Sequence, residues 1–204
     1  MDTQVTTVII SLAILLMSVV IHEISHGYVA YLLGDPTAKL AGRLTLNPLK
    51  HLDPIGSIIV PIVTSVAGFT FGWAKPVPYN PYNLQAGKWG PAAVAAAGPL
   101  SNLFIALVFG LSLRFGLVTG PAQSLIVLIT FVNIILAVFN LIPIPPLDGS
   151  KVFFSLLSYR YAWLEEFMSK NYLLLVILLL WVGGGILSMI AGFVFSLITG
   201  ISIF

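Results

Sequence analysis

The residues His22-Glu23-Ile24-Ser25-His26 form the pattern in this chain whose types and spacing point most directly to chemistry. On a helix, HExxH places two imidazoles four residues apart on one face, at the spacing that holds a single Zn²⁺ ion. The glutamate between them then lies beside the metal, where its carboxylate can take a proton from water. Residues 5–20 and 27–33, which flank the motif, carry no charge. Titratable groups inside an apolar helix are costly, so a functional site is favoured over a polar cluster that only packs against another helix.

The composition is that of an integral membrane protein. Hydrophobic residues make up 58% of the chain and charged residues 8%. A net charge of +2 without a basic run argues against nucleic-acid binding, and the absence of cysteine excludes disulfides, iron–sulfur clusters and thiolate zinc sites. Residues 1–7 lack the basic region of a signal peptide, and the first apolar run continues into the motif. We therefore expect a retained first helix.

The elements that must position the motif are predicted to be membrane helices. Apolar residues concentrate in five segments, at 5–33, 55–72, 92–115, 123–144 and 172–204. Wherever they meet lipid these segments must be helical, because backbone groups cannot stay unpaired there. The last one exceeds a single crossing, so it either tilts or breaks at Gly183-Gly184-Gly185 and turns back. We predict one all-α polytopic membrane domain over residues 1–204, with about four to six transmembrane helices.

Two connecting stretches are predicted to be irregular or extended. Residues 42–48 alternate polar and apolar side chains, which favours a short membrane-associated strand or β-hairpin. Residues 71–91 are rich in proline, tryptophan and tyrosine, a composition that suits the membrane–water boundary.

The path of residues 55–72 decides the topology. If this segment crosses the membrane, the positive charges divide four against five: Lys39, Arg43, Lys50 and Arg114 against Lys75, Lys88, Lys151, Arg160 and Lys170. If it is re-entrant and returns on the side it entered, eight of these nine share one side and only Arg114 lies opposite. The positive-inside rule favours the re-entrant path, with the shared side in the cytoplasm. Such a backbone must be covered by protein or a wet cavity.

Two histidines leave a catalytic zinc site incomplete, since such sites have three protein ligands and an open position. Asp148 is the best candidate for the third ligand, because the prolines before it break an uncharged helix where a ligand must turn inward. In the re-entrant topology the end of that helix and the HEISH end of the first helix also face the same side. His51 is a reserve ligand, although its charged neighbours favour an interfacial position. The other acids are expected to be solvated in loops or flanks: Asp2, Asp35, Asp53, Glu165 and Glu166.

These motifs resemble the site-2 protease family of intramembrane zinc metalloproteases. The resemblance rests on HEISH, on the turn Gly98-Pro99-Leu100-Ser101-Asn102 and on NLIPIPPLDG at 140–149, and it extends from residue 12 to residue 150. It implies that His22, His26 and Asp148 bind zinc and that Glu23 is the catalytic base. The stretch GRLTLNP followed by HLDPIG is similar to the β-hairpin region of the short members. Without room for a PDZ or CBS domain, regulation by such domains is not implied.

Two asparagines have both a functional and a structural interpretation. Asn102 and Asn140 could hold an extended substrate strand or stabilise the oxyanion of the transition state, or they could form interhelical hydrogen bonds. Function is favoured for Asn140, which adjoins the ligand motif, and neither interpretation is favoured for Asn102. Asn133 shares a helix face with Asn140, which supports the structural alternative for that pair. Gly98-Pro99 is expected to allow close helix approach.

Together these observations predict a zinc-dependent endopeptidase that cuts a peptide bond within or beside a transmembrane helix of a substrate protein. Its partners would be that helix and the lipid bilayer, in a prokaryotic cell membrane, with the active site opening toward the cytoplasm. A zinc transporter is the main alternative, since ZIP-type transporters carry a similar helix motif. Ser25 and Gly27 depart from that motif, and the acids are too few to line a path across the bilayer. The intact Glu23 argues against a pseudo-protease that only binds partners.

Overall fold

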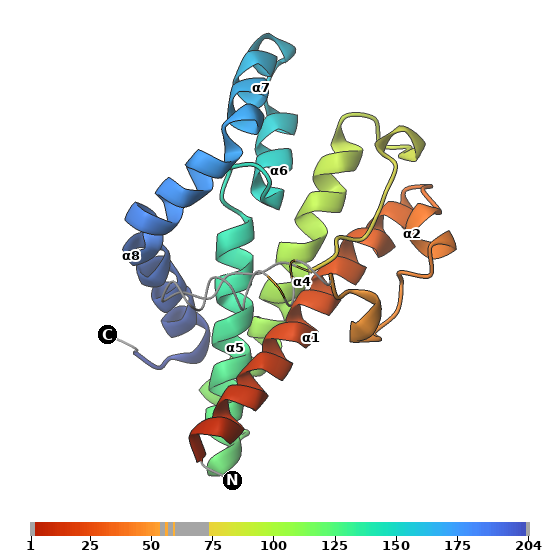
Figure 1. The fold of residues 1–204 in the computed structure, drawn as a ribbon. Helices are drawn as coiled ribbons and strands as arrows, with labels where there is room; N and C mark the ends of the chain where they lie inside the picture. The colour runs from red at the N-terminus through yellow and green to blue at the C-terminus, as the bar shows by residue number, and fades with distance from the viewer. Residues whose placement is uncertain (1–2, 54–55, 57–58, 60–73, 203–204) are drawn as a thin grey trace.

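The computed structural model describes residues 3–53, 56, 59 and 74–202, and it consists of long helices joined by short helices and turns (Figure 1). Within these residues four helices are long and apolar enough to cross a membrane. They are α1 (Thr3–Leu32), α4 (Trp89–Arg114), α5 (Pro121–Asn140) and α8 (Tyr172–Thr199). Four of the five predicted apolar segments are thus confirmed as helices. The fifth, at 55–72, lies outside the described residues apart from residues 56 and 59.

Short elements connect the long helices. In chain order they are α2 (Thr37–Leu40), η1 (Pro48–Lys50), η3 (Pro81–Asn83), α6 (Asp148–Leu156), η4 (Tyr159–Tyr161) and α7 (Ala162–Lys170). The first three lie between α1 and α4, and the last three lie between α5 and α8.

Small residues allow the long helices to pack closely. Ala106 of α4, Ile134 of α5 and Phe195 of α8 belong to one buried apolar cluster. A Cβ atom added at Gly110 of α4 would lie 2.5 Å from Cγ2 of Ile198, so only glycine permits this approach of α4 and α8. Close packing through small residues is the usual way in which membrane helices associate.

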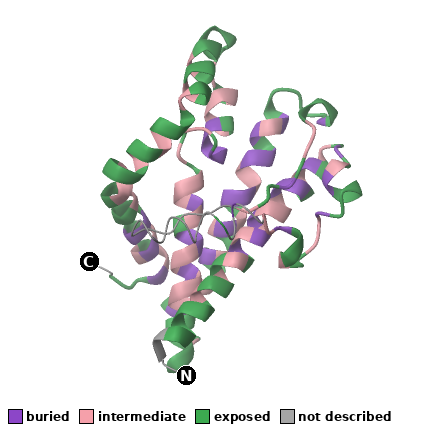
Figure 2. Ribbon diagram, viewed as in Figure 1, coloured by how far each residue is buried: buried purple, intermediate pink, exposed green. Residues whose placement is uncertain are grey.

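The second half of α1 is more buried than the first half. Val20, His22 and Ala30 are all nearly inaccessible, whereas Leu12 is 59% exposed (Figure 2). Exposed side chains along the first half are mainly apolar, as a lipid-facing surface requires. The half of α1 that carries the HEISH motif is therefore the half that α4 and its neighbours cover.

The described connections between α1 and α4 begin and end at the same end of the bundle. The N–H group of Gln85 donates to the carbonyl oxygen of Leu33 at 2.9 Å, which joins the end of α1 to the approach to α4. Arg114 lies at the opposite end, where its guanidinium donates to the carbonyl oxygen of Leu197 at 2.6 Å. The other eight cations lie in segments that connect the helices at the α1 end: Lys39, Arg43, Lys50, Lys75, Lys88, Lys151, Arg160 and Lys170.

The predicted strand or hairpin over residues 42–48 is wrong. The structure describes all of these residues, and they form a turn and bends that lead into η1. The guanidinium of Arg43 donates to the carbonyl oxygens of Lys75 and Pro76, and the ring of His51 lies 2.9 Å from the carbonyl oxygen of Thr45. The Arg43 side chain thus joins this region to residues 75 and 76, and the His51 ring pairs with the backbone of Thr45, so the alternating pattern reflects a folded loop.

α8 is one continuous helix through Gly183-Gly184-Gly185, so the alternative in which the chain breaks and turns back there is wrong. A break facing lipid would leave backbone groups unpaired, which is more costly than glycine in a helix. The 28 residues of α8 rise about 42 Å, more than the roughly 30 Å of a hydrocarbon core. Figure 1 shows α8 curved and inclined to α5.

Candidate metal and catalytic site

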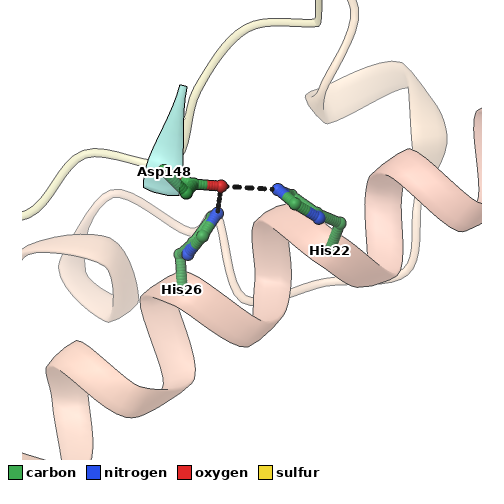
Figure 3. Close-up of side chains that lie close together, drawn as sticks. All are labelled: His22, His26 and Asp148. Atoms are coloured by element: carbon green, nitrogen blue, oxygen red, sulfur yellow. Dashed lines mark hydrogen bonds and ion pairs between the residues drawn. The ribbon is translucent and has the colours of Figure 1, made fainter. Parts of the chain in front are cut away.

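His22 and His26 project from one face of α1 toward Asp148, the first residue of α6 (Figure 3). One carboxylate oxygen of Asp148, Oδ2, lies 3.1 Å from Nε2 of His22 and 3.1 Å from Nε2 of His26. All three residues are buried. The structure thus brings together the three predicted ligands, although Asp148 is 126 residues from His22 along the chain.

Hydrogen bonds on the far side of each imidazole fix its orientation. Nδ1 of His22 lies 2.6 Å from Oδ1 of Asn102, and Nδ1 of His26 lies 2.7 Å from the carbonyl oxygen of Val94. These oxygens can only accept, so both Nδ1 atoms carry the proton and both Nε2 atoms present a lone pair. Two lone pairs and a carboxylate oxygen therefore converge on one point, an arrangement that a cation stabilises.

The donor set fits zinc. Ligand atoms of the three residues all lie within 4.8 Å of one another. Bond lengths of about 2.0–2.1 Å and tetrahedral angles would separate two ligand atoms by about 3.3 Å, close to the spacing around Asp148. Two histidines with one carboxylate also form a recognised catalytic zinc set, which leaves a fourth position open.

Two glycines make room for the cluster. A Cβ atom added at Gly98 of α4 would lie 2.5 Å from Nε2 of both His22 and His26. A Cβ atom at Gly149 would overlap the backbone of Leu141 at the end of α5. The expectation that Gly98-Pro99 permits close approach is confirmed, since Gly98 lets α4 cover the imidazoles and Gly149 lets α6 turn back onto α5.

Glu23 lies beside the ligand cluster but does not belong to it, since the group that could hold a metal contains only the other three side chains. Oε2 of Glu23 accepts a hydrogen bond of 2.8 Å from the N–H group of Val77, in the segment that precedes η3. Its second oxygen, Oε1, is left to accept a further proton or hydrogen bond. This arrangement suits a proton acceptor rather than a ligand.

Asn102 is the centre of a buried network that connects three helices. Its Oδ1 accepts from His22, while its Nδ2 donates to Oδ1 of Asn133 at 2.8 Å and to the carbonyl oxygen of Ser18 at 3.3 Å. Nδ2 of Asn133 in turn donates to Oγ of Ser18 at 3.0 Å. The amide orientation of Asn102 is therefore fixed by its partners. Ser18 was missed in the sequence, although it lies one helical turn before His22.

Asn140 stands apart from this network. Its Nδ2 donates to the carbonyl oxygen of Leu136 in the same helix at 2.9 Å, and its side chain is half-buried. The structural alternative of interhelical hydrogen bonds therefore applies to Asn133 and not to Asn140, for which a functional role was favoured.

Two other candidates occupy unexpected positions. His51, the reserve ligand, lies outside the group that could hold a metal and is only 1% exposed, so it is not a ligand of this cluster. Asp35 is fully buried, not solvated, and accepts hydrogen bonds from Thr37, Asn80 and Asn83. Glu165 and Glu166 are exposed on α7, as expected.

Lys151 is a neighbour of the site that the sequence analysis overlooked. Its ammonium group lies 4.0 Å from Oδ1 of Asp148, the oxygen that does not face the histidines, and 5.6 Å from the ring centre of Tyr79. A spacing of three residues on α6 makes Lys151 a neighbour of Asp148, so helical periodicity offered a signal for it.

The fold and the site define a membrane protein with a candidate metal centre of two histidines and a carboxylate. Residues 116–183 match the model of peptidase family M50. The chain is 42% identical over 148 residues to YwhC of Bacillus subtilis, a candidate zinc metalloprotease, covering 68% of this chain and 64% of YwhC. It is 35% identical over 144 residues to the similarly named Rip2 of Mycolicibacterium smegmatis, covering 66% of this chain and 52% of Rip2. A zinc metalloprotease of Methanocaldococcus jannaschii is 27% identical over 153 residues, 75% of this chain and 36% of that protein.

The chain belongs to peptidase family M50, the site-2 protease family, as the motifs HEISH and NLIPIPPLDG predict. It spans between about a third and two thirds of the length of these curated relatives. No solved structure is significantly similar to it.

Proposed function

We propose that this chain is a zinc-dependent endopeptidase that hydrolyses a peptide bond within or beside a transmembrane helix of a substrate protein. The convergence of Asp148 with His22 and His26, which flank Glu23 on a membrane-length helix, carries the proposal. Membership of a peptidase family whose curated relatives are named as zinc metalloproteases supports it. We further propose that residues 1–204 form a single catalytic domain.

The position of the motif along α1 supports cleavage within the membrane. His22 and His26 lie ten and six residues before the end of α1, which corresponds to about 15 and 9 Å along the helix axis. A substrate carbonyl that reached this depth in an intact helix would be shielded by its own backbone hydrogen bonds. The substrate helix must therefore unwind locally before it is cut.

Each residue of the site then has a defined role. His22, His26 and Asp148 would hold the zinc ion. When bound, zinc would act as a Lewis acid that polarises the substrate carbonyl and activates water. Glu23 accepts the proton of the attacking water and donates it to the amine of the leaving peptide, so the proton is conserved over the reaction. Asn102 keeps the ring of His22 in the orientation that exposes Nε2.

Asn140 is the proposed contact to the substrate backbone. It ends α5, lies eight residues before Asp148 and has an amide oxygen that its single hydrogen bond, through Nδ2, does not use. An amide at this place can pair with an extended peptide. The network around Asn102 instead favours a positioning role for that residue.

The charge distribution supports a cytoplasmic opening of the site. Eight of the nine cations lie at the end of the bundle where α1 ends, and Arg114 lies opposite. We propose that this end faces the cytoplasm of a prokaryotic cell and that residues 55–72 are re-entrant. The hydrogen bond between Gln85 and Leu33 supports the re-entrant path, because it places the end of α1 and the approach to α4 at the same end of the bundle.

A zinc transporter is disfavoured by the surroundings of the site. A transport path must continue through the bilayer with polar groups along it. Beyond the Asn102 network, the cavity between α1, α4 and α5 is lined by apolar side chains such as Ile14, Met17 and Phe109, with only Ser18 and Asn133 as polar members. Nothing in this cavity continues the polar path.

The decisive experiment is cleavage of a panel of transmembrane peptides by the purified full chain in detergent. We expect cleavage that a zinc chelator abolishes and that added zinc restores. A zinc-loaded protein that cuts no member of the panel, but moves zinc across the membrane of proteoliposomes, would contradict the proposal and establish the transporter.

A further inference from the structure

Residues 74–83, which we call the strap, run beside the second half of α1 toward the start of α4 (Figure 1). The strap has no regular secondary structure up to Asn80 and ends in the short helix η3. It contacts Glu23 through the N–H group of Val77. What holds the strap therefore bears on the geometry of the proposed catalytic base.

Asp35 holds one end of the strap. Its Oδ2 accepts from the N–H group of Asn80 at 2.7 Å, and its Oδ1 accepts from Nδ2 of Asn83 at 2.8 Å and from Oγ1 of Thr37 at 2.6 Å. Burial alone would raise the pKa of Asp35, but these hydrogen bonds outweigh burial and lower it. A buried carboxylate with this many donors is a firm anchor between the end of α1 and the strap.

Arg43 holds the other end. Its guanidinium donates to the carbonyl oxygens of Lys75, at 2.6 Å, and Pro76, at 3.3 Å, although the residue is only 7% exposed. The N–H group of Lys75 also donates to the carbonyl oxygen of His51 at 2.8 Å. Both bonds of the guanidinium come from Nη2, while Nε is buried without a hydrogen-bond partner among the described residues. A buried cation is costly unless its donors are used, so the two Nη2 bonds favour keeping the strap in place at residues 75 and 76.

Between its two anchors the strap lies directly on α1. The side chain of Val77 is 6% exposed, and a Cβ atom added at Gly27 would lie 2.7 Å from Cγ1 of Val77. The absence of a side chain at Gly27 therefore lets the strap approach the residue that follows the HEISH motif. At this distance the N–H group of Val77 reaches Oε2 of Glu23.

We propose that Asp35 and Arg43 are positioning residues that act on Glu23 through the strap. They hold Val77 so that its N–H group binds Oε2 and turns Oε1 toward the reacting water. A free glutamate side chain has several rotatable bonds, and one fixed oxygen removes most of that freedom. This role rests on the proposed function of Glu23 as base. Misplacing a catalytic group by about 1 Å can cost roughly 100-fold in rate.

The first test exchanges the acceptor and the donor of the hydrogen bond between Asp35 and Asn83. Asp35→Asn introduces an amide donor opposite the donors that now bind the carboxylate, so the strap is released. We expect kcat to fall roughly 10- to 100-fold with unchanged zinc content, and amide hydrogen exchange of residues 75–83 to become faster. Adding Asn83→Asp restores a donor–acceptor pair and should recover part of both losses. Glu165→Gln, which removes an exposed carboxylate of α7, is the matched control. It should change neither kcat nor the amide hydrogen exchange of residues 75–83.

The second test removes the hydrogen bond itself. Val77→Pro eliminates the N–H group, whereas Val77→Ala keeps it and shortens the side chain. We expect Val77→Pro to lower kcat at least tenfold more than Val77→Ala, with zinc content equal in both. Equal turnover in the two variants would overturn the proposal, as would a fall of kcat in Asp35→Asn without faster exchange in the strap.

A third measurement separates this inference from the proposed function. Glu23→Ala removes the acceptor, so exchange at the Val77 amide should become faster whether or not the wild-type chain cleaves any peptide. Slow exchange at Val77 in Glu23→Ala rejects the contact between strap and base. Fast exchange together with no cleavage by wild type would leave the contact standing and reject the endopeptidase.

Discussion

At the residue scale, each of the two imidazoles that face the metal position is held by a hydrogen bond on its far side. His22 is oriented by Asn102, His26 by the carbonyl oxygen of Val94, and Asp148 lies close to Lys151. Such outer contacts fix the tautomer of a histidine ligand and its ring orientation. The site therefore depends on residues that never touch the metal, and their contribution can be measured separately from that of Glu23.

Glu23→Gln should keep zinc and abolish hydrolysis, because the amide preserves the shape of the side chain but cannot accept a proton. We expect a loss of cleavage of roughly 100- to 10,000-fold at unchanged metal content. Metal analysis of the purified variant measures its zinc content, and peptide cleavage measures its activity. Cleavage near the wild-type rate would remove Glu23 from the role of base.

Asn102→Ala should weaken zinc binding roughly 10- to 100-fold, since it frees the ring of His22. Competition with a chelator of known affinity measures this change. Asn140→Ala is the control for zinc binding, because Asn140 makes no hydrogen bond to a ligand residue. If both variants bound zinc as tightly as wild type, the Asn102 network would have no part in the metal site.

At the element scale, the close approach of α4 to the HEISH face of α1 depends on the absence of a side chain at Gly98. A methyl group there would meet Nε2 of both histidines, the atoms proposed to bind the metal. Neither imidazole can withdraw, because its Nδ1 atom is already bound on the far side. α4 thus acts both as a cover for the site and as the support of its ligands.

Gly98→Ala should therefore abolish zinc binding, or displace α4 and destabilise the bundle. Gly184→Ala in α8 is the matched control, since no atom lies within 4 Å of a Cβ atom added there. Zinc content and thermal unfolding in detergent should be near wild type for Gly184→Ala only. A fully zinc-loaded, active Gly98→Ala variant would show that α4 does not cover the site as closely as the structure indicates.

At the scale of the whole molecule, the bundle has one charged end and one end with a single cation. The connections that carry most of the Lys and Arg residues are also those that carry the strap and α6, which supports the proposal that the site opens toward the charged end. The positive-inside rule then determines the orientation of the whole bundle in the membrane.

Single cysteines in this cysteine-free chain test that orientation. An impermeant thiol reagent applied to intact cells should label Leu117→Cys, between α4 and α5, and spare Lys39→Cys, Lys88→Cys and Lys170→Cys. Permeabilised cells should show labelling at all four exposed positions, which controls for access. Labelling of Lys88→Cys but not Lys39→Cys in intact cells would place the start of α4 opposite the end of α1 and contradict the described connection.

The sequence by itself determined the local chemistry and the helices. The four-residue spacing of His22 and His26 is a property of one helix, and the long apolar runs follow from what lipid demands of a backbone. Asp148 was also predictable, because the prolines before it end α5 and family resemblance names its motif. These signals are local, or repeat a known motif, so no tertiary information was needed to interpret them.

Only the tertiary structure decided which distant groups meet. The loop at 42–48 is not a strand because Arg43 and His51 pair with its surroundings, and Asp35 is buried because donors from residues 80 and 83 reach it. The contact of Val77 with Glu23 spans 54 residues and uses a backbone N–H group, which every residue but proline carries. A side-chain pattern marks where a polar group is placed along an element. It does not say which partner will satisfy that group, because the partner is chosen by the packing of segments that are far apart in the chain.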